Sequence, residues 1–376
     1  KSKENNLEQE NINLLNKTFF PNLKIKNINF ESSNKISLKI DKKYKIRESQ
    51  IFSEIDLKKI VFLNEINAKN FLPKIKPHIE LKDHSLKINY DNKNLLIEGS
   101  GKILLQDKDD KIKYYLKKND KNYNFKSSLI IEKNPFNLGL LNYEKNLDTK
   151  LTIDFEGTQF FNKKTIFKSI SFKENKNRII IHDLLLNEEL EIEKIHKVNL
   201  DFKDKNNFRN ELDLLKKKET YTLVGKSFNA DNLIEDLING DIENKKNIFS
   251  KNFNLSLDVK KIYLDKDHSL SNLTGNLKIK KNKIFAANLN AQFSKNKRMK
   301  FTINSNEGKK ITTLFLDKAE PIVKRYKFIK GYENGSLDFY SSKNKNKSES
   351  TLKIYDFKLK ELPALTKLLT LASLQG

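Results

Sequence analysis

Apolar residues alternate with polar residues along most of this chain, and that period of two constrains the fold more than any other feature. The clearest run is Tyr123, Phe125, Ser127, Leu129 and Ile131, separated by polar residues up to position 128. Strict alternation places apolar side chains on one face of a β-strand and polar side chains on the other. Runs of this kind recur from position 23 onward, roughly every 10–15 residues. The pattern therefore predicts many short strands.

So many strands with so few helices between them exclude a doubly wound α/β fold. The remaining choices are one long antiparallel meander or tandem sandwiches. In a sandwich a second sheet covers the apolar face, whereas here the candidate covering elements are few, short helices. We therefore predict a mainly β protein: a long antiparallel, twisted and curled sheet with an open groove and a few short helices. An apolar face left partly open marks a binding site.

Local patterns give a division of the chain. We predict a polar lead-in over 1–22 that begins as a loop or the end of a helix, a repetitive β-sheet region over 23–240, a polar linker over 241–252 and a C-terminal region over 253–376. Short helices are expected over 232–238 and 317–328, and residues 54–72 fit a helix or a strand. Gly99 and Gly101 are expected to form a turn or bulge between two strands.

The formal net charge is +24, which invites a nucleic-acid or anionic-membrane interpretation. Almost all the basic residues are Lys, and Arg occurs only at positions 47, 178, 209, 298 and 325. Because Arg is the usual reader of base edges and phosphates, its scarcity argues against a nucleic-acid partner. An AT-rich coding sequence explains the Lys excess, and a weak attraction to anionic lipid headgroups is compatible with it.

No motif supports catalysis. The Gly99-x-Gly101 pair lacks the third glycine of a dinucleotide fingerprint, and Gly225-Lys226-Ser227 lacks the earlier glycine of a phosphate loop. The cluster from His78 to His84 has a spacing that could supply metal ligands, but no second cluster accompanies it. There is no cysteine, which excludes disulfides and thiol catalysis. We therefore predict no enzyme activity, no cofactor and no metal site.

The last part of the chain resembles a known family. The segments that carry the likeness are Leu314-Phe315-Leu316-Asp317-Lys318-Ala319-Glu320-Pro321, then Gly331-Tyr332-Glu333-Asn334-Gly335, then Leu362-Pro363-Ala364-Leu365, and finally Ala372-Ser373-Leu374-Gln375-Gly376. Their order is similar to the C-terminal region of AsmA-like proteins of the Gram-negative envelope, in the alphaproteobacterial form. The likeness is good over 314–376, fair over 221–303 and only architectural before that. The sequence departs from the family pattern at Glu320-Pro321.

The resemblance implies an elongated, curled sheet with a hydrophobic groove that carries phospholipid through the periplasm toward the outer membrane. It further implies a piece of a longer protein, anchored in the inner membrane by a segment outside this sequence. The chain begins with Lys1, has no signal-peptide-like apolar segment and has no run of 18 apolar residues. We expect a periplasmic location, phospholipid acyl chains as ligand, and an outer-membrane or envelope protein as a further partner.

Candidate groove residues follow from the alternation in the C-terminal region. They are Leu255, Leu257, Val259, Leu277, Ile279, Leu289, Phe293, Phe301, Ile303, Leu314, Phe339, Leu352 and Ile354. A short amphipathic helix is expected to follow Pro363, with an apolar side made of Leu362, Leu365, Leu368, Leu369 and Ala372. It is expected to pack in the core, or alternatively to contact lipid. A second function stays open: a structural or assembly factor that pairs its sheet edges with strands of an outer-membrane client. A basic nucleic-acid binder ranks last.

Overall fold

A computed structural model gives the fold of this chain, and it describes residues 2–6, 24–65, 67–91, 94–161, 164–232, 249–306, 308–324, 331–344 and 347–360. The protein is mainly β, as the alternation predicts, and its large sheet is not closed into a barrel. The chain divides into two compact units, residues 1–196 with 202–206 and residues 197–201 with 207–376. Each unit is described separately below.

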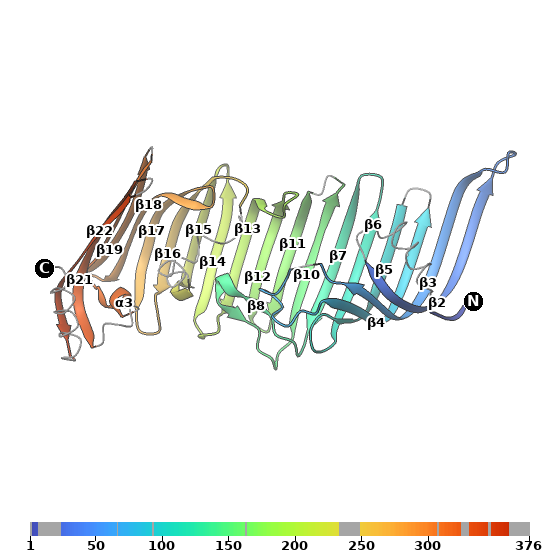
Figure 1. Cartoon of the computed structure of the whole chain (residues 1–376), viewed down its shortest axis with the longest axis horizontal. Coiled ribbons are helices and arrows are strands. Elements are labelled where there is room, and N and C mark those ends of the chain that lie inside the picture. The colour runs from blue at the N-terminus through green and yellow to red at the C-terminus, as the bar shows by residue number, and fades with distance from the viewer. Residues whose placement is uncertain are drawn as a thin grey trace. The chain divides into compact units, whose positions relative to one another are not determined.

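The first unit is an antiparallel meander in which each long strand pairs with the next one along the chain, except that β7 pairs with β10. Figure 1 shows these strands side by side. They are β1 (Ser2–Asn6), β2 (Ile25–Ile40), β3 (Ile46–Leu63), β4 (His78–Asp91), β5 (Asn94–Leu104), β6 (Asp110–Lys118), β7 (Asn122–Ile131), β10 (Leu151–Phe160), β11 (Thr165–Glu174) and β12 (Asn177–Leu186). Between β7 and β10 lie the small hairpin β8 (Asn137–Leu138) and β9 (Tyr143–Glu144) and the 3-10 helix η1 (Gly139–Leu141). Strand β13 (Ile192–Lys203) contains the boundary between the units.

The second unit repeats the arrangement with one change of direction. Its strands are β14 (Arg209–Lys217), β15 (Thr220–Asn229), β16 (Phe253–Tyr263), β17 (Ser269–Lys280), β18 (Lys283–Ser294), β19 (Lys297–Asn306), β20 (Lys309–Leu316), β21 (Tyr332–Asn344) and β22 (Lys347–Leu359). The short helix α3 (Glu320–Val323) lies between β20 and β21. All neighbouring pairs are antiparallel except β15 and β16, which are parallel.

The parallel pair corrects the expectation of an antiparallel sheet throughout. Two parallel neighbours need a crossover of about a dozen residues or more, because the chain must return to the starting end of the sheet. Residues 230–252 supply that length. The polar linker and the helix expected over 232–238 fall in this segment, and residues 233–248 lie outside the described ranges.

Other local expectations are corrected as well. Residues 2–6, within the polar lead-in where no strand was expected, form a strand paired with β2. Residues 54–63 belong to β3, so the strand alternative is right there. Gly99 and Gly101 lie inside the single strand β5, so the turn alternative is wrong, but the register does shift beside Gly101, between Lys82 and Ser85 of β4. The helix expected over 317–328 is present as α3, from Glu320 to Val323, and residues 325–330 lie outside the described ranges.

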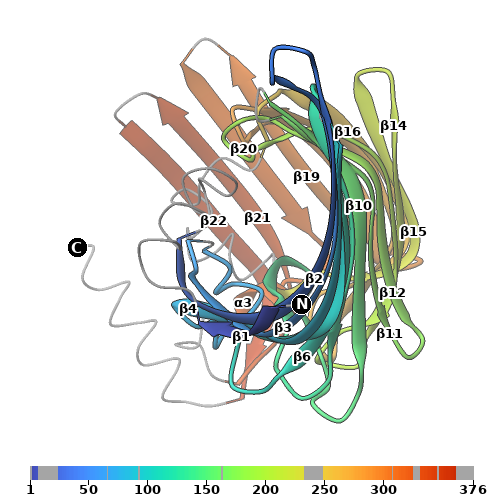
Figure 2. The ribbon, with the colours of Figure 1, turned by 90° about the vertical axis from the view of Figure 1, so that its right-hand side faces the viewer.

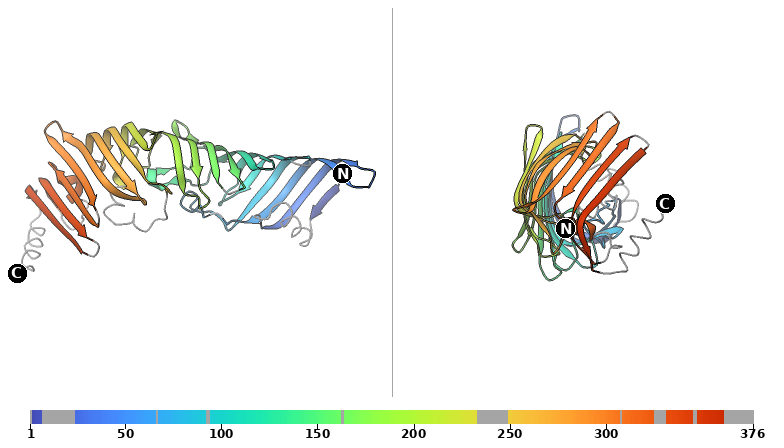
Figure 3. Two further views of the ribbon diagram at one scale, coloured as in Figure 1. Left: turned by 90° about the horizontal axis from the view of Figure 1, so that it is seen from above. Right: turned by 90° about the vertical axis from the view of Figure 1, so that its left-hand side faces the viewer.

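In each unit the strands form a single curved layer (Figure 2, Figure 3). The longer connections of the first unit, 64–77 and 132–150, join strands at the same end of the layer. In the second unit, 317–331 joins β20 and β21 at one end, and the connection 230–252 leaves β15 at that end and returns to the opposite end to begin β16. The hairpins at the opposite ends are short, as between β14 and β15 or β17 and β18.

The long connections bury one border of the sheet. Leu72, from the connection before β4, packs with the buried cluster of Ile79, Ile103 and Leu105. In the second unit, Ala319 and Val323 of the α3 segment pack on the buried residues Leu316, Tyr332 and Leu337. We call this buried border, at the end of each layer where the long connections lie, the loop margin.

Candidate functional site

One row of apolar residues crosses the whole second unit. Each residue lies directly opposite the next on the neighbouring strand, from β14 to β22. The row is Leu214, Leu223, Leu257, Gly275, Leu289, Phe301, Leu314, Phe339 and Leu352. Directly paired residues project from the same face of a sheet. We call this row the apolar ladder of the second unit, and the face that carries it the apolar face.

All thirteen candidate groove residues project from this apolar face. Six of them, Leu257, Leu289, Phe301, Leu314, Phe339 and Leu352, belong to the ladder itself. In the next row toward the hairpins, Leu255, Leu277 and Ile303 are linked through Ala287. Val259, Phe293 and Ile354 lie toward the loop margin, and Ile279 lies beside the β17–β18 hairpin.

Burial separates these candidates into two groups. Val259 and Ile303 are fully buried, at 1% and 5% exposure, which is the environment of core residues. The ladder residues are only partly buried, and Leu352 reaches 54% exposure. A second sheet packed on this face would bury the whole ladder. The ladder therefore keeps contact with solvent, as do Leu255 and Leu277 in the row beside it.

The helix predicted from Leu362, Leu365, Leu368, Leu369 and Ala372 lies outside the described residues. It stays a prediction, as does its contact with the core or with lipid.

The first unit carries an equivalent ladder, which the sequence interpretation did not single out. It runs through Ile55, Leu86, Gly99, Tyr114, Ser127, Phe155, Ile170 and Ile181, again with direct pairing at each step. The rings of Phe125, Phe155 and Phe167 form a cluster on the same face, with centroids 5.5 to 6.3 Å apart. The alternation from Tyr123 to Ile131 is the sequence signal that could have identified this ladder.

The titratable groups in the middle of this face favour their neutral forms. Burial lowers the pKa of His84, and it raises the pKa of Tyr114 to about 12. The His84 Nε2 atom lies 2.8 Å from the carbonyl oxygen of Lys102, which fits a neutral ring that donates its hydrogen to that carbonyl. His84 is thus a buried structural residue.

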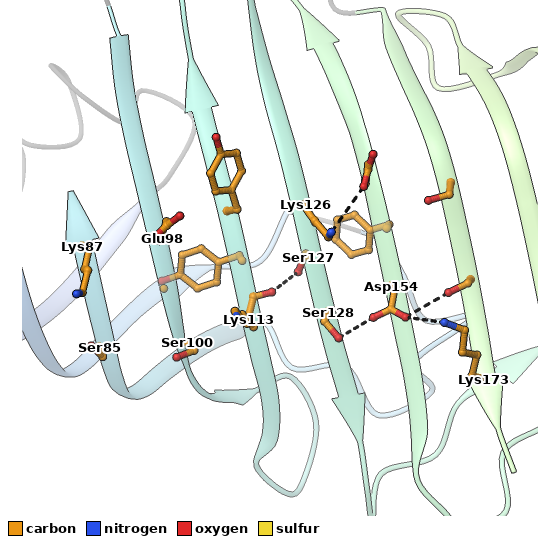
Figure 4. Close-up of a pocket in the computed structure, with 17 residues that line it drawn as sticks. Ser85, Lys87, Glu98, Ser100, Lys113, Lys126, Ser127, Ser128, Asp154 and Lys173 are labelled. Atoms are coloured by element: carbon orange, nitrogen blue, oxygen red, sulfur yellow. Dashed lines mark hydrogen bonds and ion pairs between the residues drawn. The ribbon is translucent and has the colours of Figure 1, made fainter. Parts of the chain in front are cut away.

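The opposite face is polar and hollowed. In Figure 4 a hollow of about 730 Å³ lies over β4 to β11, lined mainly by Ser, Lys and acidic side chains. Asp154 on β10 accepts hydrogen bonds from Ser128 Oγ at 2.7 Å and Lys173 Nζ at 3.2 Å. Burial alone raises the pKa of Asp154, but these donors outweigh burial and the pKa is lowered. Asp154 and Glu156 in this hollow each pair with lysine side chains, which indicates a structural role for these two carboxylates.

Two buried carboxylates hold the connection 132–150 against the loop margin of the first unit. Asp110, at 1% exposure, accepts a hydrogen bond of 2.8 Å from Asn134 Nδ2. Glu174 accepts a hydrogen bond of 2.7 Å from the Tyr143 hydroxyl. The Lys145 ammonium donates to the carbonyl oxygens of Glu132 and Asn146 at 2.7 and 2.8 Å. Each of these groups has partners within the protein, which indicates a structural role.

Neither a metal centre nor a membrane helix is found in the described ranges. No group of three His, Asp or Glu side chains there could hold a metal ion. His78 and His84, which the sequence placed in one cluster, have separate partners: the His78 ring nitrogen lies 2.6 Å from Lys26 Nζ. Among the same residues, no helix is both long enough and apolar enough to cross a membrane.

Comparison with known proteins returned no match, whether with protein-family models, with curated proteins or with solved structures.

Proposed function

We propose that this protein is a non-enzymatic lipid conduit, whose apolar face shields the acyl chains of phospholipids. The observation that carries the proposal is the apolar ladder of the second unit, which is continuous over neighbouring strands and partly exposed along its length. Such a surface binds by the hydrophobic effect, at roughly 25 cal/mol per Å² of apolar area removed from water. Because that effect is non-directional, no single residue is essential and selectivity among acyl chains is low.

The second support is the resemblance of residues 314–376 to AsmA-like proteins, which implies phospholipid transport between the inner and outer membranes. In this proposal the protein acts in the periplasm, is anchored to the inner membrane by a segment outside this sequence, and uses an envelope protein as its partner. It needs no cofactor and no metal.

The test places charge across the ladder. Leu257→Asp with Phe301→Asp puts two carboxylates where acyl chains would lie, and an unpaired ion buried against lipid tails costs several kcal/mol. The expected result is loss of co-purified phospholipid and of lipid transfer between vesicles. The matched control is Ser256→Asp with Asn304→Asp, which adds the same charge on the polar face. Transfer that is equally fast in wild type and in the ladder variant would overturn the proposal.

The competing function, an assembly factor that pairs its sheet edges with a client, makes a different prediction. It expects crosslinks from the backbone of an edge strand to a partner and no bound phospholipid. Native mass spectrometry of the purified protein separates the two functions, because phospholipid retained in the gas phase is expected only of the conduit.

A further inference from the structure

Each unit carries the same three-residue cluster on its apolar face, at the hairpin end of the strands. In the first unit, Lys118 Nζ lies 5.8 Å from the ring centroid of Tyr123, and Tyr123 meets Phe161 edge-on at 5.3 Å. In the second, Lys216 Nζ lies 5.4 Å from the centroid of Tyr221, and Tyr221 meets Phe253 edge-on at 5.3 Å. We call these the Lys–Tyr–Phe clusters.

The strand register explains why the clusters match. Lys118 is directly opposite Tyr123 across the β6–β7 hairpin, and Lys216 is directly opposite Tyr221 across the β14–β15 hairpin. The ladder residues Tyr114 and Leu214 lie on these same strands and the same face. Each cluster therefore lies where the apolar face meets the short hairpins, opposite the loop margin.

Lys118 and Lys216 contact an aromatic ring, whereas several lysines of the polar face pair with a carboxylate. On the polar face, Lys126 and Lys168 pair with Glu156, and Lys173 pairs with Asp154. Lys118 and Lys216 form no ion pair with any described residue, although each hairpin includes an acidic residue, Asp120 or Glu219. The ring below each ammonium group holds it in place without neutralising its charge.

A cation fixed at the border of an apolar face fits a ligand with an anionic group on an apolar body. The ammonium group of Lys is a compact charge with three donors, suited to a phosphate oxygen. Acyl chains on the ladder would bring a headgroup phosphate to this border. In the first unit both long connections lie at the other end, whereas in the second unit the connection 230–252 returns to this border, with the Phe249 ring 4.7 Å from that of Phe253.

Building on the proposed function, we propose that the two Lys–Tyr–Phe clusters bind the anionic headgroups of phospholipids whose acyl chains lie on the adjacent ladders. The ligand class is therefore an anionic phospholipid, and each unit holds its own headgroup site. The clusters give the protein a preference for anionic over uncharged lipid that the ladders alone cannot supply.

The test compares two probes that share a pyrene-labelled acyl chain: phosphatidylglycerol, which is anionic, and diacylglycerol, which is uncharged. The variant Lys118→Gln with Lys216→Gln keeps most of each side-chain stem and removes the charge. The control Lys117→Gln with Lys217→Gln removes the same charge from the neighbouring residues, which project from the polar face. A third variant, Lys118→Arg with Lys216→Arg, retains the charge.

The cluster variant is expected to bind phosphatidylglycerol about fivefold more weakly at each site, as for the loss of one lysine near an anionic lipid surface. Its affinity for diacylglycerol stays at the wild-type value. The control and the Arg variant bind both probes as wild type does.

Three results would overturn the assignment of the clusters: equal weakening for both probes, equal weakening in the control, or displacement of phosphatidylglycerol by inorganic phosphate alone at the same concentration. Wild type that binds neither probe would instead refute the lipid conduit itself, so the two proposals fail separately. Thermal unfolding of each variant shows whether a loss of binding reflects a loss of folding.

Discussion

Two leucines on strand β20 occupy equivalent positions of the alternating pattern but differ in burial. Leu314 and Leu316 are two residues apart and project from the same face. Leu316 is 2% exposed, because the segment around α3 packs over it, whereas Leu314 belongs to the ladder and stays partly exposed. Val259 and Leu257 on β16 show the same contrast. The loop margin is buried by the connections, and the ladder beside it stays partly exposed to solvent.

The loop margin and the ladder also differ in the polar groups that they contain. The loop margin of the first unit contains Asp110 and Glu174, each satisfied by donors that include residues of the connection 132–150. Neither ladder contains a charged residue. The only hydroxyl groups in the ladder of the first unit belong to Tyr114 and Ser127. Ordered partners make buried carboxylates tolerable at the margin. An acyl chain could not offer such partners, so a ladder that binds lipid has to be free of charge.

The largest expected effect tests the contrast directly. Leu316→Ala removes a buried side chain and leaves a cavity, so we expect the free energy of unfolding to fall by about 2–5 kcal/mol. Leu314→Ala removes the same atoms from a partly solvated position, and we expect a loss of about 1 kcal/mol. Denaturant unfolding of both variants measures the difference. Equal losses would mean that the ladder is as well covered as the margin.

The second prediction concerns pH and the loop margin. Burial raises the pKa of Asp110 from 3.8 to about 6, against the hydrogen bonds from Asn134 and the Glu132 N–H. A carboxyl group with a raised pKa binds its proton more tightly in the folded state than in the unfolded chain. Its contribution to stability is therefore complete below the unfolded pKa of 3.8 and declines as the pH rises toward 6.

Asp110→Asn removes this titration. Between pH 4 and pH 7 we expect the stability of wild type relative to the variant to fall by about 2–3 kcal/mol. Urea unfolding at several pH values gives the difference, and the exposed carboxylates cancel because both proteins carry them. A difference that does not change with pH would show that Asp110 is ionised throughout and that the donors outweigh burial.

The strands and their apolar sides could be predicted from the sequence, because alternation is a local signal. Tyr123 to Ile131 and Leu255 to Val259 both project as the pattern indicates. The continuity of the ladders could not be predicted, because it depends on register across many strands. A bulge at Asp83, with φ of 50°, and another near Asn272, with φ of 54°, shift that register. Asp and Asn tolerate positive φ, but so many of them occur here that the sequence does not indicate which ones do.

Two further features depend on contacts between distant residues. The parallel step from β15 to β16 depends on where the chain returns after residue 252, which no local pattern encodes. The burial of one margin depends on apolar residues within polar connections, such as Phe136, whose ring lies 5.7 Å from that of Phe172. The candidate groove residues of the second unit could be predicted from the sequence. Which of them form the ladder, and which lie in the buried loop margin, could be seen only from the register of the strands.

The third prediction tests how tightly the apolar face is packed near the margin. A Cβ atom at Gly101 would lie 2.2 Å from His84 Cδ2, so Gly101→Ala forces the buried imidazole to move. Overpacking of this kind costs about 1–3 kcal/mol. His84→Ala made in the same chain opens the space, and we expect the double variant to lose less stability than the two single losses added together. Additive losses would mean that the backbone, and not the histidine, resists the methyl group.

The smallest effect on stability is expected at the β2–β3 hairpin, where the apolar face is farthest from any long connection. Leu38 projects from the apolar face at 50% exposure, and Phe52 projects from the polar face of the same hairpin at 38%. Replacing either by Asn changes an already solvated position, so both variants are expected to unfold within about 0.5 kcal/mol of wild type.

Binding should separate these two variants where stability does not. If the apolar face is the lipid-binding surface of the first unit, Leu38→Asn removes apolar area that an acyl chain would cover, and Phe52→Asn removes area that it never touches. We therefore expect only Leu38→Asn to reduce the binding of pyrene-labelled phosphatidylglycerol, by about threefold for the loss of one partly covered side chain. An equal reduction in both variants would mean that lipid binds wherever apolar area is exposed, and that the division into two faces does not decide binding.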